Sequence, residues 1–129
     1  LHVKNMEIKD NLKYTENHEW VLIEDNIAVV GITDYAQSEL GDIVYVDIDS
    51  VGQDLNVDDV FGSVEAVKTV SDLYMPVSGK IIELNDQLDS NPELLNQDPY
   101  NAGWIIKVEL NNLDYDQLLS SEQYKNLIG

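Results

Sequence analysis

Lys68 is the residue whose type and position most clearly suggest chemistry. It lies within GSVEAVKTVSDLYMPVSG, residues 62–79, a mostly apolar and β-prone segment, and it is the first lysine or arginine after Lys13. Val67 and Thr69 flank it, and the segment lacks the Asn-Gly or Asp-Gly pair that tight hairpin turns prefer. An amine on a rigid turn is accessible to a modifying enzyme, and acylation would add a long apolar arm whose chemistry belongs to a cofactor. A solvated lysine at a hairpin tip is the alternative interpretation.

Two near matches to ion-binding motifs each fail at a required position. Residues 62–69 approach the phosphate-binding pattern G-x-x-x-x-G-K-[ST], but Val67 replaces the second glycine, and a β-branched residue opposes the backbone conformation needed there. Residues 47–52 begin like a calcium-binding EF-hand loop, but Val51 stands at the fifth ligand position and Asp58 replaces the glutamate at the twelfth. The sequence therefore predicts neither a nucleotide site nor a calcium site.

The residues that usually perform catalysis are scarce. The chain has no cysteine, which excludes disulfides, thiolate metal sites and cysteine nucleophiles. His2 lies in an N-terminal stretch expected to fray, and His18 precedes a strand, where a packing or capping role is expected. No Ser-His-Asp arrangement, H-E-x-x-H motif or glycine-rich dinucleotide fingerprint is apparent. The chain is therefore not expected to be an independent enzyme.

The charge balance excludes further classes of function. Seven lysines, no arginine and 25 acidic residues give a formal net charge of −18. Such a surface repels nucleic acids and anionic membranes, because phosphate binding needs neutralising cations. No apolar run approaches the roughly 20 residues needed to span a bilayer. Mutual repulsion between copies favours a monomer.

The pattern of apolar runs and turn residues predicts a mainly β chain with short helices. Residues 20–23 and 27–32 read as a hairpin, and Thr33 caps a helix over 34–40 that Gly41 ends. Further strands are expected at residues 43–48, 60–66, 69–75, 81–84 and 104–110. Residues 41–46 resemble residues 79–84, which would arise from two equivalent β halves or from chance.

Two helices are expected in the second half of the chain. Asn91 and Pro92 predict the N-cap and the first residue of one helix. Residues 120–123, SSEQ, predict a capping box, and the apolar residues around them fall near helical spacing. A C-terminal helix is therefore expected after the last strand.

Several short segments, each weak alone, occur in a specific joint order and spacing. They are LKYT (12–15), HEWV (18–21), VGITD (30–34), AQ (36–37), LGDIVYV (40–46), FGSVEAVKTVSD (61–72), PVSG (76–79), NPELLN (91–96), PY (99–100) and GW (103–104). Over nearly its whole length the chain resembles the H-protein family of the glycine cleavage system. The resemblance implies a lipoyl-type fold, a flattened barrel-sandwich hybrid of two β halves with short helices and a C-terminal helix. It implies one domain over residues 1–129, with a flexible N-terminal segment over residues 1–10.

The same resemblance implies a function and a cofactor. Lys68 would carry covalent lipoate, attached by a lipoate ligase or lipoyltransferase. The lipoyl group would receive an aminomethyl group from a pyridoxal phosphate-dependent glycine decarboxylase and deliver it to a tetrahydrofolate-dependent aminomethyltransferase. Lipoamide dehydrogenase would then reoxidise the arm. The protein would be a non-catalytic carrier and a substrate of these enzymes, in the bacterial cytoplasm or, in a eukaryote, in the mitochondrial matrix.

Relatives of this family shield the loaded arm in a surface cleft. The positions that match residues lining that cleft are Glu19 and Asp72, with Asn17 and Ser71 as further candidates. An anion beside a protonated amine stabilises the charged form. An ordinary exposed carboxylate is the alternative interpretation for both acidic residues.

Three other functions remain open at this point. The same lipoyl-lysine would serve a relay that donates lipoate to other lipoyl-dependent enzymes. An unmodified acidic β domain would act as an interaction module. A biotin carrier is disfavoured, because biotinyl lysines typically lie between two methionines, whereas Val67 and Thr69 flank Lys68.

Overall fold

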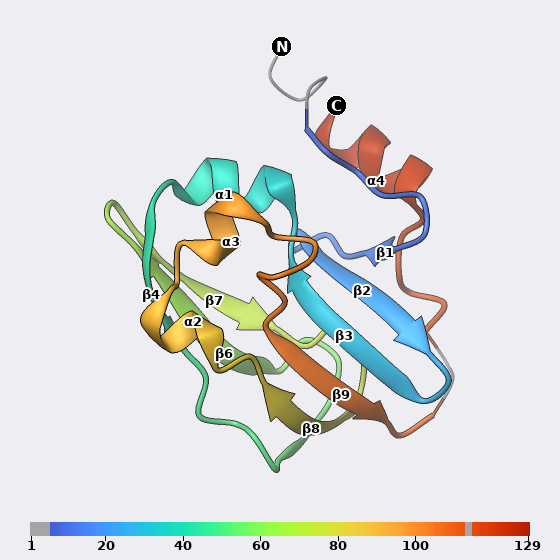
Figure 1. Cartoon of the computed structure of the whole chain (residues 1–129). Helices are drawn as coiled ribbons and strands as arrows, with labels where there is room; N and C mark the ends of the chain where they lie inside the picture. The colour runs from blue at the N-terminus through green and yellow to red at the C-terminus, as the bar shows by residue number, and fades with distance from the viewer. Residues whose placement is uncertain (1–5, 113–114) are drawn as a thin grey trace.

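Two antiparallel sheets form the framework of the chain. The computed structural model describes residues 6–112 and 115–129 (Figure 1). One sheet has the strand order β1-β2-β3-β9-β8-β5, and the other has the order β4-β6-β7. The strands are β1 (Lys13–Tyr14), β2 (Glu19–Glu24), β3 (Ile27–Ile32), β4 (Ile43–Asp47), β5 (Asp54–Leu55), β6 (Val60–Ala66), β7 (Val70–Tyr74), β8 (Gly79–Leu84) and β9 (Ile106–Leu110). The mainly β fold is confirmed, as two open sheets rather than a closed barrel.

Short helices connect or cover the strands. They are α1 (Asp34–Leu40), α2 (Gln87–Ser90), α3 (Leu94–Gln97) and α4 (Ser121–Ile128). Figure 1 shows α1 and α3 on the side of the β6–β7 turn, with α4 beside β1 on another side. None of the helices in the described ranges has the length and apolar character needed to cross a membrane.

The predicted caps of α1 and α4 are confirmed. The Thr33 side chain accepts a hydrogen bond from the N–H of Ala36, and Gly41 follows α1 with a φ of 79°. The Ser120 and Gln123 side chains form the reciprocal capping box of α4. Both caps satisfy N–H groups that the first helical turn leaves without a partner, which explains why these local signals succeed.

The main hydrophobic core joins the two sheets. Its buried members include Val21 and Val30 from the larger sheet, and Phe61 and Val64 from the smaller one. A second cluster packs α4 against the first strands, with Tyr14 and Tyr124 stacked at a ring-centroid distance of 4.6 Å. Burial of each such side chain contributes about 1.5–3 kcal/mol, so the two clusters fix the sheets and α4 to one another.

One helix start differs from the prediction. The N-cap of α3 is Glu93, and Asn91 and Pro92 form a preceding turn in which the N–H of Leu94 bonds to the Asn91 carbonyl at 3.1 Å. The prediction that Asn91 caps the helix was wrong. The cap signal did not account for α2, which ends at Ser90 and already constrains the conformation of Asn91.

The expected flexible segment over residues 1–10 falls partly outside the described residues, which begin at position 6. The rest of the segment lies against the body of the protein. The N–H of Glu7 donates to Asp34 Oδ2 at 2.9 Å, and the hydroxyl of Tyr14 bonds to the backbone of Lys9. These contacts anchor the described part of the segment to α1 and β1.

The two similar segments, residues 41–46 and 79–84, fall in different sheets. The first contains β4, which pairs with β6 in the three-stranded sheet. The second forms β8, between β9 and β5 in the larger sheet. Their relation by a pseudo-two-fold axis stays a prediction.

Candidate cofactor attachment site

Lys68 is exposed and lies in the turn between β6 and β7. Figure 1 shows this hairpin protruding from the smaller sheet. The N–H of Ala66 donates to the Thr69 carbonyl at 2.8 Å and closes the two-residue turn around Val67 and Lys68. Neither of these residues has a positive φ, so the turn is not the Asn-Gly type that the sequence also lacked. Val67 and Val70 are 77% and 64% exposed. The hairpin thus presents a lysine next to two largely exposed valines.

A loop from another part of the chain supports this turn. The N–H of Val67 donates to the Asp42 carbonyl at 3.0 Å. A Cβ atom added at Gly41 would lie 3.4 Å from Cε of Lys68 and 3.9 Å from its Nζ. The lysine side chain therefore passes directly over Gly41. Within the described part of the chain, Lys68 forms no ion pair.

Glu19 is buried at the beginning of β2, with 2% of its surface exposed. Its Oε2 accepts a hydrogen bond from the N–H of Tyr74 at 2.8 Å, and its Oε1 accepts one from the Thr15 hydroxyl at 3.2 Å. Thr15 Oγ1 also accepts from the N–H of Asn17 at 3.2 Å. Glu19 therefore links β2 to the end of β7, the strand that begins just after the Lys68 turn.

Burial raises the pKa of Glu19 from 4.5 to about 8. The hydrogen bonds from Tyr74 and Thr15 oppose this rise, whereas the negative charge of Asp58 adds to it. At neutral pH the carboxyl is consequently mostly protonated. A cation reaching it would favour the ionised form and lower the pKa again.

Glu19 and Asn17 line the same pocket. The pocket has a volume of about 280 Å³, and Asp58, Met75, Gln117 and Leu118 are among its other lining residues. Asp58 and Gln117 come from distant loops, and no local motif in the sequence pointed to them.

Asp72 and Ser71 do not line this pocket. Both belong to β7, where Asp72 is exposed and pairs with Ser63, and Ser71 is half-buried and pairs with Val64. Successive strand residues point to opposite faces, so the two side chains face different ways. The structure thus brings Glu19 and Asn17 together and places Asp72 and Ser71 along the strand that leads from the Lys68 turn toward them.

His18 has a structural role in the described contacts. Its Nδ1 lies 3.0 Å from the Tyr124 hydroxyl, which is 2.7 Å from Thr33 Oγ1. Burial lowers the pKa of His18, although Glu39 opposes this, so the ring is neutral near pH 7. The expected packing role is confirmed, and it joins α4 to the cap of α1. His2 lies outside the described residues.

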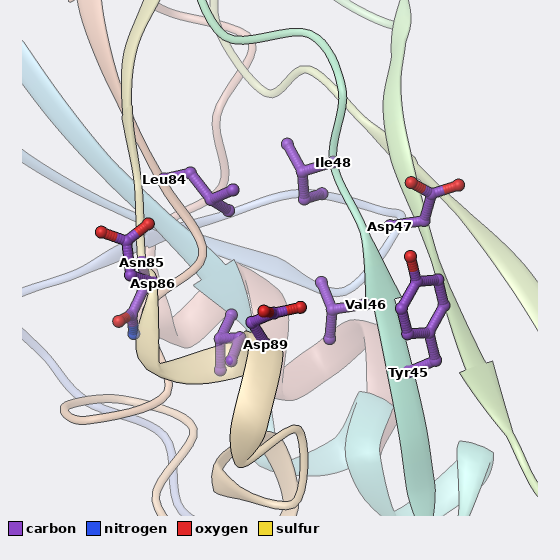
Figure 2. A pocket seen from close by; sticks show the side chains of 9 residues that line it. Tyr45, Val46, Asp47, Ile48, Leu84, Asn85, Asp86 and Asp89 are labelled. Atoms are coloured by element: carbon purple, nitrogen blue, oxygen red, sulfur yellow. The ribbon is translucent and has the colours of Figure 1, made fainter.

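A separate acidic pocket holds none of the predicted site residues. It has a volume of about 370 Å³, between β4 and the segment that joins β8 to α2. Figure 2 shows Val46 of β4 and Ile48, just after β4, facing Leu84 and Asp89, whereas Tyr45 and Asp47 point away. Among the described residues, no group of His, Cys, Asp or Glu is arranged to hold a metal ion.

A two-sheet β domain with an exposed lysine on a hairpin has the features expected of a lipoyl-type carrier domain. The glycine cleavage H-protein family model matches residues 12–129. Glycine cleavage system H proteins of Staphylococcus haemolyticus and Staphylococcus epidermidis are 52% and 50% identical over 125 residues, which cover 96% of this chain and 99% of each relative. The crystal structure of a glycine cleavage system H protein from Mycobacterium marinum matches with a TM-score of 0.88 and 37% identity, over 95% of this chain and 99% of that one. The chain belongs to the glycine cleavage H-protein family.

Family membership establishes the type of function. Proteins of this family are non-catalytic carriers with lipoate covalently attached to a lysine. They interact with glycine decarboxylase, aminomethyltransferase and lipoamide dehydrogenase. The chain is therefore a lipoate-bearing shuttle of the glycine cleavage system, and the interpretation as an unmodified interaction module is set aside.

Proposed function

We propose that Lys68 is the lysine that carries the lipoyl group. The observation that carries this proposal is its place at the tip of an exposed hairpin turn, between uncovered valines. Lys9, Lys107 and Lys125 each form an ion pair, with Glu7, Glu83 and Asp10 respectively. Lys13 and Lys80 lie within strands β1 and β8. Of the lysines in the described ranges, Lys68 is the one on a protruding turn that an enzyme can enclose.

The proposed arm reaches toward Glu19 along β7. Tyr74 lies six positions after Lys68, so their Cα atoms are at most about 20 Å apart at the strand rise of about 3.3 Å per residue. A lipoylated lysine side chain has about a dozen bonds of about 1.5 Å, and extends roughly 15 Å from its Cα. The aminomethyl group adds about 3 Å by the same bond lengths. The loaded arm can therefore approach the carboxyl group that is bonded to the N–H of Tyr74.

The proposed partner of the carried amine is Glu19, assisted by Asn17. The buried carboxyl lines a pocket that the neighbouring residue Asn17 shares. A protonated amine seated there would meet a group that accepts hydrogen bonds and becomes negatively charged in its presence. Asp72, exposed on β7, would lie along the path of the arm, with Ser71 beside it on the other strand face. The lipoyl group supplies the transfer chemistry, and these residues bind the amine and exclude water from it.

The setting of this function is a further part of the proposal. We place the protein in the bacterial cytoplasm, since the relatives compared above include bacterial proteins. We propose that it acts as a single-domain monomer, because a net charge of −18 makes two copies repel each other. A lipoate ligase or lipoyltransferase would attach the cofactor.

Site mapping tests the attachment point. The full chain is incubated with a lipoate ligase, lipoate and ATP, then digested and analysed by mass spectrometry. We expect the lipoyl adduct on Lys68 alone. Lys68→Arg should remain folded and unmodified, because this route does not acylate a guanidinium, whereas Lys80→Arg is the control and should be modified normally. An adduct on Lys80 or Lys107 instead of Lys68 would show that the assignment is wrong.

A further inference from the structure

Asn96 connects three segments of the chain next to the Lys68 turn. Its Oδ1 accepts a hydrogen bond from the N–H of Ile43 at 2.9 Å. Its Nδ2 donates to the Gly41 carbonyl at 2.9 Å and to Gln37 Oε1 at 3.0 Å. One side chain from α3 thus holds the last turn of α1, the loop at residues 41–42 and the first residue of β4.

The loop that Asn96 holds is the one that contacts the lysine turn. Asp42 accepts the hydrogen bond from the N–H of Val67, and Gly41 lies under the aliphatic part of Lys68. Gly41 has a φ of 79° and a ψ of −158°, a conformation that only glycine adopts readily. The loop therefore has a specific shape, which the two hydrogen bonds from Asn96 to Gly41 and Ile43 maintain.

The lysine turn has few other means of holding its position. The bond from Ala66 to Thr69 closes the hairpin but does not attach it to another element. Val67 and Val70 are largely exposed, so they contribute little packing. Ala66, at the base of the turn, pairs with Ile43 of β4, and the hydrogen bond from Val67 to the Asp42 carbonyl joins the turn itself to the 41–42 loop. Movement of the 41–42 loop would consequently loosen the turn itself, while the pairing of β4 with β6 still holds its base.

We propose that Asn96 is a positioning residue for Lys68, which holds the 41–42 loop against the β6–β7 turn and so presents the lysine amine to the enzyme that acylates it. This inference rests on the proposed function, in which Lys68 is the acylated residue. Asn96 acts through Gly41 and Asp42 and makes no hydrogen bond to Lys68. Misplacement of a reacting group by about 1 Å can reduce a rate by about 100-fold, so a mobile turn should be a poor substrate.

Asn85 provides a matched control. Its Nδ2 donates to the carbonyls of Ala102 and Trp104 at 2.8 and 2.7 Å, and its Oδ1 accepts from the N–H of Gln87 at 3.2 Å. It therefore makes as many side-chain hydrogen bonds as Asn96, two donated and one accepted, but these bonds do not involve the 41–42 loop or the turn. Asn85 is also the more buried of the two, so its loss should destabilise the fold at least as much.

The experiment compares Asn96→Ala, Asn96→Asp and Asn85→Ala in the full chain. Asn96→Asp keeps the size and the acceptor for Ile43 but removes the donor to Gly41, and so covers the case in which the alanine variant does not fold. Two readouts are measured: kcat/KM for lipoylation by a lipoate ligase, and hydrogen exchange of the Val67 amide by NMR. We expect both Asn96 variants to exchange the Val67 amide faster and to lose about ten-fold or more in kcat/KM. Asn85→Ala should lower the melting temperature and leave both readouts unchanged.

Two results would overturn the inference. One is unchanged Val67 exchange and unchanged kcat/KM in the Asn96 variants. The other is an equal loss in Asn85→Ala, which would mean that the effect follows general destabilisation. If the unsubstituted protein is not acylated at Lys68, the attachment site is wrong, and the exchange of the Val67 amide still decides whether Asn96 holds the turn.

Discussion

Replacement of Glu19 by glutamine should flatten the pH dependence of the protein's stability above about pH 5. Burial raises the pKa of Glu19 from 4.5 to about 8 in the folded state. Between these values, the unfolded chain has released a proton that the folded chain still holds. The stability that the neutral carboxyl contributes is therefore fully present below pH 4.5 and is lost as the pH rises through 8.

The size of the effect follows from the two pKa values. Each pKa unit corresponds to about 1.4 kcal/mol, so the interval from 4.5 to about 8 gives an upper limit of about 5 kcal/mol. Water that enters beside the ionised carboxylate would reduce this figure. We expect the wild-type free energy of unfolding to fall by about 2–5 kcal/mol, relative to Glu19→Gln, between about pH 5 and 9. Glutamine keeps an oxygen for the N–H of Tyr74 and has no proton to lose.

Urea unfolding at intervals of one pH unit measures this difference. Glu16→Gln is the matched control, because Glu16 lies in the loop just before β2, has the same side chain as Glu19 and is exposed. Its curve should run parallel to that of the wild type. The titrations of His18 and of the other acids are common to all three proteins and cancel in the comparison.

Parallel curves for wild type and Glu19→Gln across this range would refute the reasoning. They would mean that Glu19 ionises in the folded state as it does in the unfolded chain. The carboxylate would then be hydrated despite its burial and its contacts with Tyr74 and Thr15.

Two further predictions concern the loaded carrier and its encounters. Glu19→Gln and Asp72→Asn should leave lipoylation intact but shorten the lifetime of the aminomethyl-loaded form several-fold, because each carboxylate–amine contact is worth about 1 kcal/mol or more if partly desolvated. The rate at which formaldehyde and ammonia are released measures this lifetime. Asp47→Asn is the control, because Asp47 is exposed on the same face of the small sheet as Asp72. The apparent KM of the partner enzymes for the carrier should rise with ionic strength, because salt screens the attraction between the acidic carrier and its partners over about 8 Å at physiological ionic strength. If the apparent KM in the reconstituted system does not change with salt, the net charge of −18 serves solubility only.

The elements that the sequence predicted correctly depend on neighbouring residues. The α1 and α4 caps, the β2–β3 hairpin and the separate strands β6 and β7 each follow from residues within a few positions of one another. The start of α3 was misplaced because α2, which no separate sequence signal predicted, fixes the chain just before it. Local signals therefore failed where one short helix constrains the next.

The environment of the site could not be predicted in the same way. The sequence suggested Glu19 as a carboxylate beside an amine, but the pKa of its buried carboxyl also depends on the hydrogen bond from Tyr74 and the charge of Asp58, which come from another strand and a distant loop. The contacts of Asn96 with Gly41 and Gln37 join residues more than 50 positions apart. Such pairings are decided by tertiary packing, so that only the fold reveals the protonated state of Glu19 and the support of Lys68.

Strand β7 connects the two parts of the site at a constant spacing. At one end, the Lys68 turn is attached to the 41–42 loop through the N–H of Val67. At the other end, the N–H of Tyr74 is attached to Glu19. Because both attachments and the pairing of β7 with β6 resist movement, the lysine and the pocket cannot shift independently. On the proposed assignment of Lys68 as the attachment point, the swing of the cofactor comes from the flexible arm alone, and the protein determines where that arm starts and which carboxyl group it can reach.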